Sequence, residues 1–294
     1  SLGAISTTGL VPACRTLDCI SVFATTVDDA WRVYRLIAGK DDADPYSRAI
    51  ALAGLTAPAP RPRLGVPRPK DLLFFGDAAA KAEWRASVEI MQQMGVELVD
   101  VDFTRFFETA NLLYEGPWVA ERYAALRTAL ETQAGDFHPV TRKVIEKAKG
   151  YSAADAFDGL YKLEALKRAS EKVFAGVDAL LVPTAPYAPT LEDVKSDPIG
   201  PNIRLGTYTN FVNLLDLAAI AVPGPMRKDK LPAGITLIGP RGSDGSLASL
   251  ARAFHHKAAA TIGCTGRPLP APTPLDRLST AGLIEIAVVG AHLS

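Results

Sequence analysis

The sequence has few of the side chains that build metal centres or disulfide frameworks. Its 294 residues include four histidines and three cysteines, Cys14, Cys19 and Cys264, with no Cys-x-x-Cys pair. An odd number of widely spaced cysteines favours free thiols in a reducing, cytoplasmic setting. The low histidine count argues against a histidine-rich metal centre, and no cofactor is expected.

The chain also lacks an excess of charge of either sign and a long apolar run. Lysine and arginine number 32, aspartate and glutamate also 32, and the formal net charge is zero. This balance gives no electrostatic reason to expect nucleic acid or an anionic membrane as a partner. No apolar run reaches the roughly 20 residues that a membrane-spanning helix needs.

Apolar residues make up 48% of the chain, enough for a sizeable core. The patterning predicts strands at residues 63–66, 96–101, 177–182, 219–222 and 234–238, with strand and turn at 2–14. The apolar runs at 177–182 and 219–222 are typical of strands buried on both faces. The patterning predicts helices at residues 30–37, 77–94, 103–114, 117–133, 139–149, 152–175, 207–217 and 243–260, and Thr26 and Asp77 are expected to cap the first two. The early strand–helix–strand order favours parallel pairing, so we expect an α/β fold with a mixed sheet covered by helices.

Both ends of the chain suggest a fragment. It begins at Ser1 without methionine, and it ends just after a strand-like run, GLIEIAVVGAHLS. Residues 267–279 are expected to form a proline-rich linker. Residues 280–294 would then be the first strand of a truncated C-terminal domain.

The stretch with the most chemistry is YEGPWVAERY, residues 114–123. Gly116 and Pro117 are expected to interrupt a helix there. With that break, Tyr114 and Arg122 can turn into one pocket. An arginine can hold a planar carboxylate by two parallel hydrogen bonds, and a tyrosine hydroxyl can bond a neighbouring oxygen or amide nitrogen. The alternative is a structural role, with Arg122 paired to Glu121 or Glu115 on a solvated face and Tyr114 in the core.

Other motifs point to structure rather than chemistry. The run GPRGSDGS lacks the GK[ST] of a phosphate loop, so a turn before a helix capped by Ser243 is favoured. Asp41, Asp42 and Asp44 lack the ligand order of a calcium loop and are expected to form a surface turn. His138 precedes a proline at a helix start, where a capping role is expected. The chain contains no GxSxG.

Several blocks, in order, resemble the amidase signature family. They are SLGAISTTGLVPACRTLDCISVFATTVDDAWRVYRLIAG, DALLVPTAP, TNFVNLLDLAAIAVPG and PAGITLIGPRGSDGSLASLARAF. The resemblance runs from residue 1 to roughly 265. It implies that residues 1–266 are the later part of an amidase domain, with an amidase-signature-type mixed sheet covered by helices on both faces.

Within that family, YEGPWVAERY and the tail resemble the allophanate hydrolases of urea degradation. The resemblance implies that Tyr114 and Arg122 bind the small-molecule substrate allophanate (urea-1-carboxylate), with Arg122 on its carboxylate. It implies urea carboxylase as the pathway partner, fused or separate, and leaves a homodimer open. A general amidase, or the amidase component of an amidotransferase, is the alternative within the family. A non-catalytic remnant or interaction module is the alternative outside it.

One departure from the family is decisive. Amidase signature enzymes use a lysine, a serine in a cis peptide and a nucleophilic serine within a Gly/Ser-rich stretch. No such stretch occurs in this sequence, and Ser6, Thr7 and Thr8 match the block that follows the nucleophile. The resemblance therefore implies that no catalytic residue lies in this chain. The triad would lie upstream, and the chain alone would be inactive.

Overall fold

The computed structural model describes residues 1–259 and 261–275. The strand predicted at residues 280–294 and the end of the predicted linker lie outside the described residues. The part of the linker that is described, up to residue 275, carries no helix or strand longer than a single bridge, between Thr261 and Pro268.

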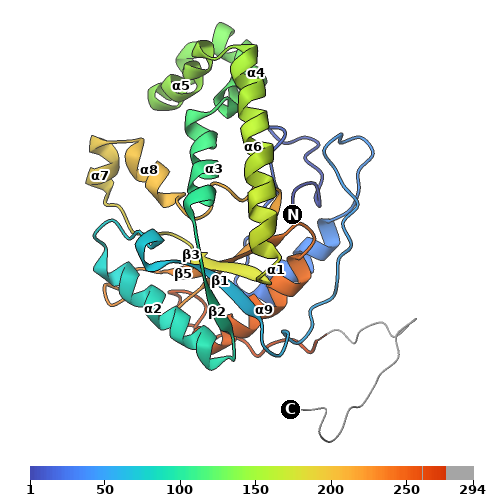
Figure 1. The fold of residues 1–294 in the computed structure, drawn as a ribbon, viewed down its shortest axis with the longest axis vertical. Helices are drawn as coiled ribbons and strands as arrows, with labels where there is room; N and C mark the ends of the chain where they lie inside the picture. Colours follow the sequence, from blue (N-terminus) through green and yellow to red (C-terminus); the bar gives the residue numbers. More distant parts are fainter. Residues whose placement is uncertain (260, 276–294) are drawn as a thin grey trace, which may run out of the picture.

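A five-stranded mixed sheet lies at the centre of the described residues (Figure 1). Its strands are β1 (Arg63–Pro67), β2 (Glu97–Val101), β3 (Ala179–Pro183), β4 (Leu217–Pro223) and β5 (Gly234–Pro240). Their order across the sheet is β2-β1-β3-β5-β4. Strand β1 runs parallel to β2 and β3, while β5 runs antiparallel to β3 and β4. The predicted α/β fold with a mixed sheet is confirmed.

The two central strands are apolar because both of their faces are covered. All five residues of β3 are buried, and so are the first six of β5. Side chains alternate between faces, so Leu180 and Leu181 belong to different apolar clusters. Strand β4 differs from the prediction of a buried strand. Within the described residues it pairs only with β5, and Ala219 and Ala221 are exposed.

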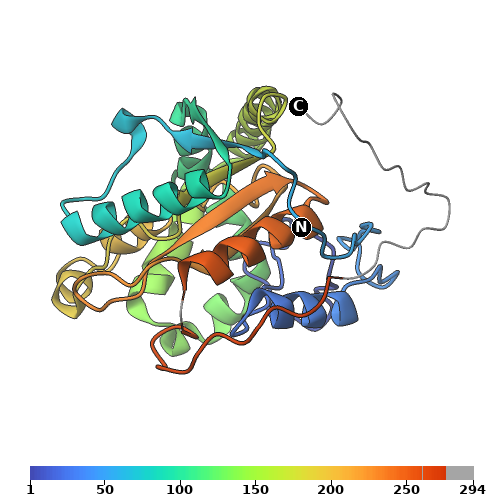
Figure 2. The same ribbon diagram turned by 90° about the horizontal axis from the view of Figure 1, so that it is seen from below.

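Three helices cover one face of the sheet (Figure 2). They are α1 (Val27–Ile37), α2 (Ala78–Gln93) and α9 (Asp244–Ala258). Trp84 of α2 and Phe254 of α9 pack with Leu181 and Leu237 of the sheet. The predicted caps at Thr26 and Asp77 are present, since each side chain accepts a hydrogen bond from the first turn of its helix.

A second layer of helices covers the opposite face. It contains α3 (Thr104–Glu115) and α6 (Ala153–Phe174), from which α4 (Trp118–Thr132) and α5 (Pro139–Glu146) extend away from the sheet (Figure 1). Aromatic rings fill the core beneath α3, where Phe106 and Phe211 have ring centroids 4.8 Å apart. Short helices α7 (Leu191–Ser196) and α8 (Gly200–Leu205) and three 3₁₀ turns, Pro69–Asp71, Ala134–Asp136 and Lys147–Gly150, complete the described elements.

Two predicted elements are wrong. Residues 2–14 contain the predicted turns, together with bends, but not the predicted strand. Residues 207–216 form successive turns rather than a helix, although Tyr208, Phe211 and Leu214 are buried at a helix-like spacing of three. Asp216 has a φ of 56°, and its left-handed backbone breaks any helix just before β4 begins. The apolar spacing was therefore right about burial but not about backbone conformation.

Candidate functional site: the break between α3 and α4

The helix break is built by a glycine that tolerates no side chain. Gly116 donates its N–H to the Leu112 carbonyl, and a Cβ placed on it would lie 2.4 Å from that oxygen. Pro117 then starts α4, and it packs against Gly159 of α6, where an added Cβ would lie 2.4 Å from the proline ring. The predicted interruption at Gly116 and Pro117 is present. It is fixed by close backbone packing rather than by an unusual φ at the glycine.

The break brings Tyr114 and Arg122 together. The guanidinium carbon of Arg122 lies 5.6 Å from the centroid of the Tyr114 ring, within the range of a cation–π contact. Both residues are partly buried. On a continuous helix they would lie about two turns apart. The structure thus places the two residues in one cluster, and their role in binding substrate stays a prediction.

The structural alternative for Arg122 does not match the observed contacts. The carboxylate of Glu121 accepts two hydrogen bonds from Thr16, one from the backbone N–H at 2.7 Å and one from the hydroxyl at 2.8 Å. Glu115 is contacted through its backbone carbonyl, which accepts a hydrogen bond from the Tyr151 hydroxyl. Among the residues that the structure describes, no carboxylate forms an ion pair with Arg122.

A buried cysteine completes this cluster. Arg122 Nε donates to Cys14 Sγ at 3.4 Å, and the thiol in turn points to the Trp118 carbonyl at 3.7 Å. Burial raises the pKa of Cys14 despite the nearby guanidinium, so the sulfur stays a protonated thiol. The sequence singled out Glu121 as an alternative partner of Arg122, but no pattern marks Cys14 or Thr16 as parts of the site. Their partners lie more than a hundred residues away in the chain.

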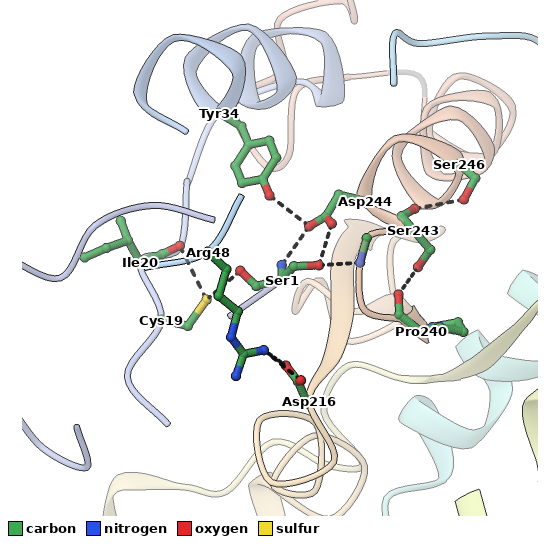
Figure 3. A network of polar contacts seen from close by, with 11 residues as sticks. Ser1, Cys19, Ile20, Tyr34, Arg48, Asp216, Pro240, Ser243, Asp244 and Ser246 are labelled. Carbon is green, nitrogen blue, oxygen red and sulfur yellow. Dashed lines mark hydrogen bonds and ion pairs between the residues drawn. The ribbon is translucent and has the colours of Figure 1, made fainter. Parts of the chain in front are cut away.

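A second polar cluster joins the start of the chain to α9 (Figure 3). The Ser1 ammonium and hydroxyl donate to the Asp244 carboxylate at 2.7 and 2.6 Å, and the Tyr34 hydroxyl adds a third hydrogen bond. The cluster holds the start of the chain against α1 and α9.

Ser243 lies beside this cluster, at the N-cap position of α9. Its hydroxyl donates to the Pro240 carbonyl at 2.6 Å and accepts no hydrogen bond from the helix. Ser243 is therefore the N-cap residue, as predicted, but its side chain makes no capping hydrogen bond. The segment before the helix is a turn, as predicted, with Gly242 at a φ of 85°.

The remaining predicted motifs have structural roles. Asp41 accepts hydrogen bonds from Ser6 and Thr8, and Asp44 accepts two from Thr7. The turn is present, but Asp44 is 6% exposed, so it is buried rather than on the surface as predicted. The Ser6 hydroxyl donates to the Asp41 carboxylate, whose pKa is lowered by this and neighbouring hydrogen bonds, so Asp41 is a poor base for activating a serine.

The described histidines and acidic groups give no sign of a metal centre. His138 accepts a hydrogen bond from the Val140 N–H, which is the predicted capping role. His255 is 2% exposed, and burial lowers its pKa, so it is neutral. Across the described residues, no group of three or more His, Cys, Asp and Glu side chains could hold a metal ion. In the same part of the chain, no helix is both long and apolar enough to cross a bilayer.

Comparison with known proteins decides the family. The model of the Amidase family matches residues 1–248. The chain belongs to the amidase family. Curated relatives include the urea amidolyases of Saccharomyces cerevisiae and Lachancea kluyveri, which are 37% and 36% identical. Each alignment covers 99% of this chain and 16% of the relative, so the chain spans only a small part of either protein.

Solved structures of amidase-family proteins share the fold. Kluyveromyces lactis allophanate hydrolase is 37% identical with a TM-score of 0.87, over 92% of this chain and 45% of that one. Kluyveromyces lactis urea amidolyase has a TM-score of 0.88, over 94% of this chain and 17% of that one. A glutamyl-tRNA(Gln) amidotransferase chain of Thermotoga maritima has 22% identity and a TM-score of 0.70, over 92% of this chain and 59% of that one, and it shows the fold alone.

Proposed function

We propose that this chain is the later part of the amidase domain of an allophanate hydrolase, in which Tyr114 and Arg122 bind the substrate. The observation that carries the proposal is the charge on Arg122. Its guanidinium is partly buried beside Tyr114 and forms no ion pair within the described residues. A partly buried cation with no carboxylate partner loses some of its solvation, so a site that keeps one is suited to an anionic ligand.

Allophanate fits this site by its chemistry. It is a small, planar anion with one carboxylate and several amide groups. Arg122 would pair with the carboxylate, and the Tyr114 hydroxyl would bond a neighbouring oxygen or amide nitrogen. The similarity to an allophanate hydrolase, whose name states this activity, supports the assignment.

The chemical step would use residues outside this chain. In the proposed mechanism an upstream serine attacks the terminal amide, and a lysine relays protons through a second serine. Backbone N–H groups then stabilise the oxyanion of the acyl-enzyme reaction. The contribution of this chain would be to orient the substrate, because correct positioning lowers the barrier to attack.

A carboxylase that makes allophanate from urea would be the pathway partner. The chain covers 45% of the allophanate hydrolase but 17% of the urea amidolyase from the same organism, so the urea amidolyase is the longer polypeptide. This difference supports a carboxylase joined to the hydrolase in such relatives. We infer the same partner here, either fused or separate.

The test is ammonia release from allophanate. It compares this chain with a longer protein that also carries the upstream Lys–Ser–Ser segment, and we expect only the longer one to be active. In that protein, Arg122→Ala should raise KM by about 10- to 100-fold, since hydrogen bonds to charged groups contribute about 1.5–3 kcal/mol. Arg127→Ala is the matched control, because Arg127 is exposed on the same helix.

Three outcomes would count against the proposal in different ways. Equal effects of the two arginine variants would remove Arg122 from the site. Cleavage of an uncharged amide of similar size, without cleavage of allophanate, would favour a general amidase or the amidase component of an amidotransferase. Activity of the short chain alone would contradict the upstream location of the nucleophile.

A further inference from the structure

The contacts of Arg122 leave one edge of its guanidinium group open. Nε donates to Cys14 Sγ, and the Tyr114 ring lies against the guanidinium at 5.6 Å. Within the described residues, no hydrogen bond or ion pair occupies the two terminal nitrogens. Two parallel hydrogen bonds to a carboxylate need two adjacent N–H groups, and the open edge supplies them.

The sulfur that accepts from Nε is itself held in place. Cys14 is 3% exposed, and its thiol is directed at the Trp118 carbonyl. The backbone N–H groups of Ala13 and Cys14 both donate to the Asp18 carboxylate at 3.0 Å. A few residues on, the Leu17 carbonyl accepts a hydrogen bond from Asn213. Residues 14–18 therefore form an ordered support, which we name the 14–18 loop.

The 14–18 loop also binds Glu121, the acidic neighbour of Arg122. Thr16 donates two hydrogen bonds to Glu121, the residue that precedes Arg122 on α4. Both residues therefore reach the same loop, Glu121 through Thr16 and Arg122 through Cys14. Without Thr16, the Glu121 carboxylate would compete with a bound anion for the Arg122 guanidinium. Thr16 instead donates a hydrogen bond to each of the two oxygens of that carboxylate.

We propose that the 14–18 loop positions Arg122 for a carboxylate. Cys14 fixes the Nε edge, and Thr16 holds the Glu121 carboxylate, so that the terminal nitrogens face the substrate. Neither residue touches the reacting atoms, and both act through Arg122. The identity of the anion rests on the proposed function, whereas the orientation of the guanidinium does not.

The kinetic test uses the catalytically complete protein. Cys14→Ala should raise KM for allophanate about three- to tenfold, the value of one hydrogen bond, with kcat within twofold. Cys14→Ser keeps an acceptor and should change KM less than Cys14→Ala does. Cys264→Ala is the matched control, because Cys264 is a free, exposed thiol. An equal rise in KM for an uncharged amide of similar size would show a general packing defect and overturn the proposal.

The second test separates the charge of Glu121 from its packing. Thr16→Val should raise KM for allophanate, and adding Glu121→Gln should restore it to within twofold, because a neutral amide no longer competes for the guanidinium. A double variant as impaired as Thr16→Val would contradict the role given to Thr16.

A third measurement does not depend on the substrate. Nuclear magnetic resonance of the ¹⁵N-labelled protein reports the exchange of the Arg122 Nε–H with water. We expect slow exchange in the unmodified protein and at least tenfold faster exchange in Cys14→Ala. Unchanged exchange would overturn the positioning role even if allophanate is the substrate. If allophanate is not cleaved but exchange does change, the positioning role stands and the proposed function fails.

Discussion

Replacing Gly159 by alanine tests how the site is held on the scaffold. Gly159 lies inside α6, where a glycine normally weakens a helix. A Cβ at this position would lie 2.4 and 2.7 Å from two ring atoms of Pro117, the residue that starts α4. Contacts of 3.4–4 Å are ordinary, so the two helices would have to separate by about 1 Å.

The magnitude follows from two opposing effects. Alanine in a helix interior is favoured over glycine by about 1 kcal/mol. Overpacking in a filled core costs about 1–3 kcal/mol, and a proline ring cannot rotate away. We therefore expect Gly159→Ala to lower the free energy of unfolding by about 1 kcal/mol. A shift of about 1 Å at a positioning group should also lower kcat/KM for allophanate by about tenfold or more.

The assays are urea denaturation and steady-state kinetics. Ala165→Gly is the control, because Ala165 is exposed on the same helix, and it should lose about 1 kcal/mol from helix propensity alone. A Gly159→Ala protein that is more stable by about 1 kcal/mol, with unchanged kcat/KM, would show that no clash exists. That result would refute the account of the helix break.

Three further predictions concern single groups. Tyr114→Phe should raise KM for allophanate about two- to tenfold, measured by ammonia release, because it removes one hydrogen bond. Cys14 should resist iodoacetamide while Cys264 is alkylated, as mass spectrometry would show; equal labelling would contradict the burial of Cys14. Burial alone would raise the pKa of Asp77, but backbone hydrogen bonds and Arg227 outweigh it and lower the pKa. This stabilisation is present above about pH 4 and is lost as the pH falls through the lowered pKa. Arg227→Gln should therefore make the free energy of unfolding less dependent on pH below about pH 4, and an unchanged slope would refute this account.

The local elements could be predicted because local chemistry decides them. Gly116 and Pro117 mark the helix break by backbone rules that apply in any fold. Asp77 and Thr26 mark helix starts for the same reason. The apolar run of β3 predicted a strand buried on both faces, and the structure confirms it.

The sequence could not predict the features that depend on distant partners. Thr16 and Glu121 are 105 residues apart, and Cys14 and Arg122 are 108 apart. No periodicity links such pairs, so only the folded chain shows them. The same limit explains Asp44. Its acidic neighbours in the sequence led to the prediction of a surface turn, but Asp44 accepts a hydrogen bond from the Thr7 N–H and is buried. Residues 207–216 fail for another reason, because their apolar spacing suits a run of turns as well as a helix.

The contacts of Arg122 in the folded chain are stronger evidence for a bound ligand than its place in the sequence is. A surface arginine next to a glutamate gains little from a salt bridge and can remain solvated. Here the glutamate is instead bound to Thr16, and the guanidinium is partly buried against Tyr114 and Cys14. Leaving a partly buried guanidinium without a carboxylate partner costs some stability. An anion bound at the open edge would offset this cost, and allophanate supplies a carboxylate of the required geometry.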